Sequence, residues 1–64
     1  MKRTVLDIMK HINEPTNPTH IYIVGKTLGW LADEATYEEV DFAVIRLSVE
    51  GQIKKIDNVN YEVK

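Results

Sequence analysis

The most suggestive chemical pattern in this sequence is Gly25-Lys26-Thr27. A glycine followed by lysine and threonine ends the phosphate-binding loop in which backbone amides and a lysine hold phosphate groups. That loop also requires a glycine five residues earlier, where this chain has His20, and the residues between are Ile, Tyr, Ile and Val. We therefore interpret Lys26 as an ordinary exposed lysine and expect no nucleotide site.

Other residue types that support catalysis or metal binding are sparse. His11 and His20 are the only histidines, and the absence of cysteine excludes a thiolate zinc site. Ser48 is the only serine, and it falls within a predicted helix rather than on a strained turn. The acidic stretch from Asp33 to Asp41 lacks the alternating ligands and central glycine of a calcium loop. We predict no metal, no cofactor, no small-molecule substrate and no enzymatic activity.

Length and composition indicate one small domain, residues 1–64. A chain this short buries only about 60% of its unfolded surface, and without cysteine it must rely on an apolar core or on oligomerisation. No run approaches the roughly 18 apolar residues of a membrane span. The basic start is followed by alternating charged and apolar residues, unlike a signal peptide. We therefore expect a cytoplasmic protein, and its net charge of −2 argues against general binding of polyanions.

Two helices are predicted in the first half of the chain. The first is expected to start after Thr4, which can cap it, and to end at Asn13-Glu14-Pro15. Asn17 and Pro18 are typical of the start of a second helix, which we expect to run to about Leu28. Ile21-Tyr22-Ile23-Val24 also reads as a strand, and the alternative to a helix over all of these residues is extended character from Thr19 to Ile21, as a short strand.

A third helix and a hairpin are predicted in the second half. Thr36 and Glu39 form a capping box, in which each residue satisfies a free amide of the other. The helix is expected to cover Tyr37 to Glu50, and Gly51 suits the left-handed residue that follows a helix. After the turn-forming Asp57-Asn58-Val59-Asn60, the apolar Tyr61 and Val63 alternate with Glu62 and Lys64, which predicts a β-hairpin over Gln52 to Lys64 that packs on the helices.

This order of elements resembles the winged helix-turn-helix superfamily. Such domains commonly end the third helix with an apolar pair, a glycine and an apolar strand start, here Val44, Leu47, Gly51 and Ile53. The resemblance implies an α+β fold: three helices, a C-terminal β-hairpin as the wing, and a short strand before the second helix. It also implies that the third helix enters the DNA major groove and that the wing contacts the DNA backbone or minor groove.

The outward face of the third helix does not fit that role. With Val40, Val44 and Leu47 facing the core, a rotation of about 100° per residue brings other residues to the opposite side. They are Glu38, Phe42, Ile45 and Val49, with Asp41 and Arg46 beside them. Reading base edges needs donors such as arginine, lysine or asparagine, and carboxylates repel phosphates. This helix is therefore predicted to be a poor reader of DNA.

The second apolar stripe, Phe42, Ile45 and Val49, leaves two interpretations open. The first helix can cover part of it, as in an ordinary core helix that is buried on two sides. Alternatively the stripe is exposed and binds another protein or a second copy of the chain. Trp30 follows the second helix, and we interpret it as a lid on the core rather than an exposed stacking platform.

Two functions are consistent with these patterns, and we favour the first. It is a non-enzymatic, regulatory module for protein interaction or dimerisation. Its surface would consist of Glu38, Asp41, Phe42, Ile45, Arg46 and Val49. The alternative is a small DNA-binding transcriptional regulator with weak affinity, which contacts DNA through the wing and the N-terminal bases. These residues are Lys2, Arg3, Lys10, Lys54 and Lys55, which are otherwise ordinary solvated side chains.

Overall fold

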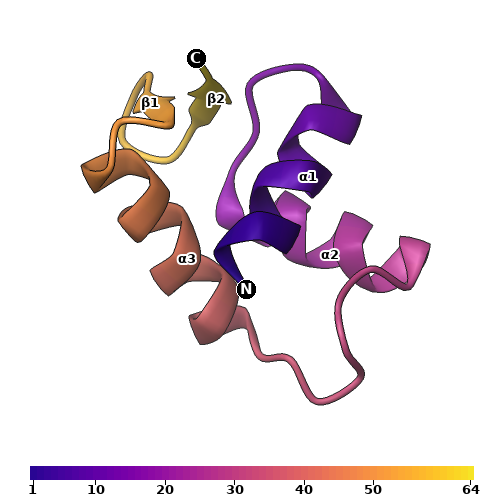
Figure 1. Cartoon of the computed structure of the whole chain (residues 1–64). Helices are drawn as coiled ribbons and strands as arrows, with labels where there is room; N and C mark the ends of the chain where they lie inside the picture. The colour runs from indigo at the N-terminus through magenta and orange to yellow at the C-terminus, as the bar shows by residue number, and fades with distance from the viewer.

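The computed structural model describes all 64 residues and shows three helices followed by a two-stranded antiparallel sheet (Figure 1). The helices are α1 (Lys2–Ile12), α2 (Pro18–Leu28) and α3 (Tyr37–Val49), and the strands are β1 (Ile53–Lys55) and β2 (Tyr61–Val63). The predicted α+β order with a C-terminal hairpin is therefore confirmed. None of the three helices has the length and apolar character needed to cross a lipid bilayer.

Helix α1 begins earlier than the sequence predicts. It starts at Lys2 rather than after Thr4, and Met1, the residue before the helix, provides no side-chain cap. The Lys2 ammonium instead pairs with Glu50 at the far end of α3, which holds the first turn of α1 in place. The end of α1 agrees with the prediction, because Asn13 adopts a left-handed conformation with φ of 58°.

Helix α2 begins as predicted, but the short strand before it lies elsewhere. The Asn17 side chain accepts a hydrogen bond from the His20 amide at 2.9 Å and so caps the helix. The prediction of extended residues from Thr19 to Ile21 is wrong, because this cap starts the helix immediately before them. The extended position is Thr16, which forms an isolated antiparallel bridge with Tyr61 of β2.

Helix α3 has the capping box that the sequence predicts. The Glu39 amide donates to the Thr36 hydroxyl oxygen at 3.2 Å, and the Thr36 amide donates to the Glu39 carboxylate at 3.0 Å. At the other end Gly51 has φ of 80°, a conformation that glycine adopts without strain. The helix therefore has defined ends, and its outer face extends over the residues between them.

The hairpin is short and depends on a side-chain turn. Ile53 pairs with Val63, and Lys55 pairs with Tyr61. In the connecting turn one carboxylate oxygen of Asp57 accepts hydrogen bonds from two successive backbone amides, each at 2.9 Å. An aspartate that binds backbone amides in this way holds the turn in a single conformation.

One continuous hydrophobic core joins all the elements. Each helix packs against the other two, and the hairpin lies at the C-terminal end of α3 and touches α1 through β2 (Figure 1). The buried apolar residues are Val5, Leu6, Ile8, Met9, Ile21, Leu31, Ala35, Val40, Ala43, Val44, Leu47, Ile53 and Tyr61. Because α3 contributes four of them from one side, its opposite side faces away from the protein.

Candidate protein-interaction site

The outer face of α3 is an exposed apolar surface. The exposed fraction is 60% for Phe42, 46% for Ile45 and 81% for Val49. Helix α1 therefore leaves this stripe uncovered, although it packs against α3. The sequence left open whether the stripe is covered or exposed, and in the structure it is exposed.

Acidic residues occupy the N-terminal half of this face. Glu38 is exposed and forms no ion pair or side-chain hydrogen bond, while Asp41 is half-buried. Glu39 belongs to the capping box and is exposed as well. Carboxylates near a helix N-terminus are stabilised by the helix dipole. The first two turns of α3 contain no basic residue, so this half of the face is negatively charged.

Arg46 is the only basic residue on the outer face of α3. Its guanidinium lies 5.7 Å from the centroid of the Phe42 ring, within the range of a cation–π interaction. A guanidinium nitrogen also lies 3.9 Å from a Glu50 carboxylate oxygen. Arg46 therefore lies between the apolar stripe and a polar cluster at the C-terminal end of the helix.

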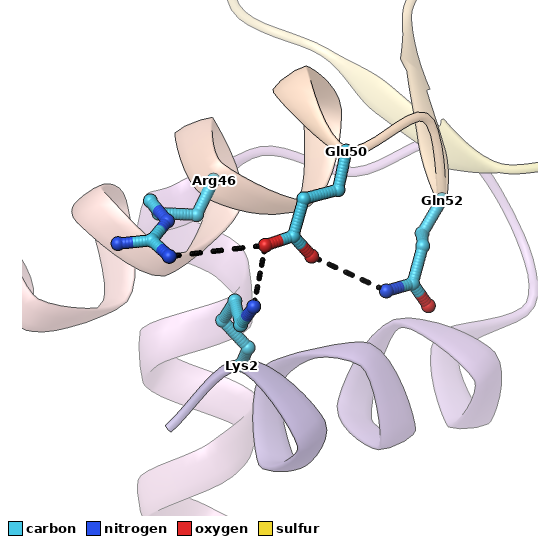
Figure 2. Close-up of polar contacts among 4 residues, drawn as sticks. All are labelled: Lys2, Arg46, Glu50 and Gln52. Atoms are coloured by element: carbon cyan, nitrogen blue, oxygen red, sulfur yellow. Dashed lines mark hydrogen bonds and ion pairs between the residues drawn. The ribbon is translucent and has the colours of Figure 1, made fainter.

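Figure 2 shows this polar cluster, which joins the start of α1 to the end of α3. The Lys2 ammonium donates to one carboxylate oxygen of Glu50 at 2.5 Å, and the Gln52 amide donates to the other at 3.4 Å. The hydrogen bond from Lys2 is the main reason that the pKa of the Glu50 carboxyl is below its ordinary value of 4.5. Two cations and one carboxylate leave this end of α3 positively charged.

A hollow lies beside Phe42, between α3 and the first residues of α1. Its volume is about 250 Å³, and it is lined by Met1, Lys2, Glu39, Phe42, Ala43 and Arg46. Sequence reasoning placed Phe42 and Arg46 on the interface but missed Glu39 and Ala43. The spacing 39, 42, 43 and 46 marks adjacent positions on one helix surface, and this signal was available in the sequence.

The basic residues of the alternative DNA-binding surface are mostly accompanied by acidic or aromatic side chains. Arg3 lies 3.9 Å from Asp7, and Lys54 lies 3.6 Å from Glu62 across the hairpin. Lys55 lies on the Tyr61 ring, with its ammonium 6.0 Å from the ring centroid. Lys10 lines a second hollow in which Lys64 is accompanied by Glu14 and Glu62. Lys2 is bonded to Glu50, as described above, so most of these positive charges have a nearby carboxylate.

Lys26 has a structural role that the sequence did not reveal. Its ammonium donates to the backbone carbonyls of Ala32 at 2.8 Å and Asp33 at 2.7 Å. These bonds tie the loop between α2 and α3 back to α2. In the Gly25-Lys26-Thr27 segment, Lys26 therefore binds backbone carbonyls of the chain itself and not a phosphate group.

The aromatic and metal-ligating side chains form no second site. Trp30 is 46% exposed, so its interpretation as a core lid is wrong; the loop leaves it at the surface, where its ring meets His11 edge-on at 5.3 Å. No three side chains of histidine, aspartate or glutamate lie close enough together to hold a metal ion.

Comparisons with known proteins assign no family to this site. No family model matches the chain, and neither the curated proteins nor the solved structures include a significant match. The function is therefore argued from the α3 face alone.

Proposed function

We propose that this chain is a small, non-enzymatic winged-helix module that binds protein through the outer face of α3. The observation that supports this most strongly is the exposure of Phe42, which is 60% accessible in a domain of only 64 residues. A small domain has few apolar side chains to spare from its core, and exposed apolar patches on such domains are typically binding surfaces.

The composition of the face also fits protein recognition. Phe42 is an aromatic side chain at the centre, Ile45 and Val49 continue the apolar stripe, and Arg46 packs against the aromatic ring. Aromatic residues and arginine are enriched among the residues that contribute most to protein interfaces. The acids Glu38 and Asp41 form part of a polar rim, which determines the charge of a suitable partner.

The DNA-binding alternative has less support. A regulator that uses the wing and the N-terminal bases needs Lys2, Arg3 and Lys54 free for phosphates, and all three have carboxylates within 4 Å. Insertion of α3 into a major groove brings Glu38 and Asp41 toward the phosphates, where like charges repel. We therefore retain DNA only as the competing hypothesis.

The proposal is tested by mutation of the exposed stripe with a matched control elsewhere. Phe42→Ala and Ile45→Asp alter the α3 face, whereas Val59→Ala removes an equally exposed apolar side chain, 59% accessible, from the wing. Self-association is measured by sedimentation, and binding of other proteins is measured by capture on the immobilised chain. We expect both α3 variants to lose association and Val59→Ala to keep it.

The same variants distinguish a binding surface from a covered one. Because Ile45 is half-exposed, Ile45→Asp should leave the melting temperature nearly unchanged, since the new carboxylate remains in water. A variant that unfolds instead of losing its partner shows that the face is buried. Association that survives Phe42→Ala shows that the partner binds elsewhere. Either result rejects the proposal.

A further inference from the structure

The hollow beside Phe42 has the form of a socket for a side chain from another helix. Four of its lining residues, Glu39, Phe42, Ala43 and Arg46, lie on α3 at spacings of three, four and seven residues. These are the relative positions that form a hole in knobs-into-holes packing between two helices. Ala43 is almost fully buried and has the smallest side chain of the four, so it forms the floor of the socket.

Phe42 is suited to be the side chain that fills such a socket. It stands at the edge of the hollow and is largely exposed, so its ring is available to another molecule. A two-fold axis that passes between two copies at the level of Phe42, perpendicular to α3, brings a second, antiparallel α3 face to face with the first. Each copy then places its Phe42 opposite the hollow of the other, and one chain supplies both the knob and the hole.

The charges on α3 favour the same arrangement. The N-terminal half carries Glu38, Glu39 and Asp41 without a base, and the C-terminal end is positive because Lys2 neutralises Glu50 beside Arg46 (Figure 2). In an antiparallel pair centred on Phe42, Arg46 faces Glu39 of the partner helix, because these two residues are seven apart and lie on the same side of α3. In a parallel pair the acids of both copies would lie side by side and repel each other. Antiparallel helix dipoles also attract.

From this geometry we propose that the partner of the α3 face is a second copy of this chain. The two copies form a symmetric antiparallel dimer, with the two-fold axis at the level of Phe42 and with Arg46 of each copy opposite Glu39 of the other. This inference rests on the proposed function, because it specifies the occupant of the same face.

The test combines charge changes at the two ends of the helix. Arg46→Glu places a carboxylate against Glu39 of the partner, and the symmetry creates this repulsion twice. Glu39→Gln is the matched change at the other end, and it removes the charge but keeps an oxygen that accepts from the Thr36 amide in the capping box. Dimerisation of the wild type, both single variants and the double variant is measured by sedimentation equilibrium.

The expected result is that the Glu39→Gln substitution changes dimer affinity in opposite directions in the wild type and in the Arg46→Glu variant. Arg46→Glu should weaken the dimer by about tenfold or more, because like charges across an interface are strongly unfavourable. Glu39→Gln should weaken the wild-type dimer, where it removes an attraction, but it should strengthen the dimer of the Arg46→Glu variant, where it removes a repulsion. Damage to the fold cannot produce this pattern, since the double variant carries both local changes. Melting curves recorded at low concentration confirm that each monomer is folded.

Three outcomes overturn the inference. A wild-type chain that stays monomeric up to about 1 mM, the limit of a weak interaction, excludes the second copy as the partner. A dimer that Glu39→Gln weakens in both the wild type and the Arg46→Glu variant has a different register. A dimer that Phe42→Ala leaves intact uses another surface.

These outcomes separate the dimer from the broader proposal. If the chain is monomeric but captures another protein only when Phe42 is present, the dimer is wrong and the α3 face remains a protein-binding surface. If a dimer forms without any contribution from Phe42, Ile45 or Arg46, both proposals are wrong.

Discussion

Thr16 and Tyr61 exchange two backbone hydrogen bonds, although α2 and α3 lie between them in the sequence. The Thr16 amide donates to the Tyr61 carbonyl at 2.9 Å, and the Tyr61 amide donates to the Thr16 carbonyl at 2.7 Å. This bridge attaches the segment before α2 to the edge of β2 and so extends the two-stranded sheet by one residue. The Thr16 hydroxyl is buried at this position and has no hydrogen-bond partner.

The unpartnered hydroxyl predicts a stabilising substitution. Thr16→Val replaces a buried polar group with a methyl of similar size and leaves both backbone bonds in place, so the unfolding free energy should rise by about 1 kcal/mol. Thr16→Ala is the control, because it also removes a buried methyl and should destabilise the fold. Urea denaturation measures both. A Thr16→Val protein that is less stable than the wild type indicates that the hydroxyl does have a partner.

The two sides of α3 should respond differently to the loss of an apolar side chain. Leu47 is 1% exposed, and Leu47→Ala should cost about 2–5 kcal/mol through the cavity that it leaves. Val49, two residues away, is 81% exposed, and Val49→Ala should change the stability of the monomer by no more than about 0.5 kcal/mol. Thermal unfolding at low concentration makes the comparison. Similar losses at both positions contradict the assignment of the two faces.

Gly25 should resist replacement although it lies inside a helix. A methyl group at this position would lie 2.6 Å from the Leu31 side chain and 2.7 Å from that of Ile8. Alanine favours helices over glycine by about 1 kcal/mol, but crowding of a packed core typically costs about 1–3 kcal/mol. We therefore expect Gly25→Ala to lower the melting temperature. Leu31→Ala removes one of these two contacts, so in the Leu31→Ala background the same glycine change should cost less stability than it does in the wild type.

The hairpin turn should loosen in acid. Hydrogen bonds, first from the Val59 amide and then from Asn60, hold the pKa of the Asp57 carboxyl below its ordinary value of 3.8. A carboxyl whose pKa is lowered in the folded state stabilises the fold above its ordinary pKa, and this stabilisation is lost as the pH falls through the lowered value. The wild type should therefore be more stable than the Asp57→Ala variant above pH 3.8, and this difference in unfolding free energy should shrink as the pH falls below 3.8.

The control for this pH effect is Asp57→Asn, which keeps an acceptor oxygen but cannot titrate. Its stability relative to Asp57→Ala should not vary over the same range. Melting temperatures between about pH 5 and pH 2, which span the ordinary titration of aspartate, make the comparison. A wild-type advantage that stays constant throughout contradicts the assigned role of the carboxylate.

DNA binding should be weak and should depend strongly on salt. Any affinity must come from the bases rather than from α3, so it should fall between about 50 and 200 mM salt and should decrease when Lys54 and Lys55 are both replaced by alanine. Titration of a fluorescent duplex at the two salt concentrations measures this. Tight binding to one duplex sequence that is insensitive to salt contradicts the prediction and favours the DNA-binding alternative.

Local features of the fold were readable from the sequence. The capping box of Thr36 and Glu39, the Asn17 cap and the left-handed Gly51 were all predicted and are present. Each of these depends on contacts between residues only a few positions apart, so the identities of neighbouring residues suffice to predict them. The two apolar stripes of α3 were visible for the same reason, because helical periodicity is a local property.

The arrangement of the helices determined the remaining features. The start of α1 was misplaced because Lys2 bonds to Glu50, the strand residue was misplaced because Thr16 pairs with Tyr61, and Trp30 was misplaced because its loop turns outward. Helical periodicity predicted two apolar sides of α3, but it could not show which of the two sides the rest of the protein covers. The packing of α1 and α2 against α3 buried Val44 and left Phe42 exposed beside the hollow. The candidate site is therefore a consequence of contacts between residues that are distant in the sequence.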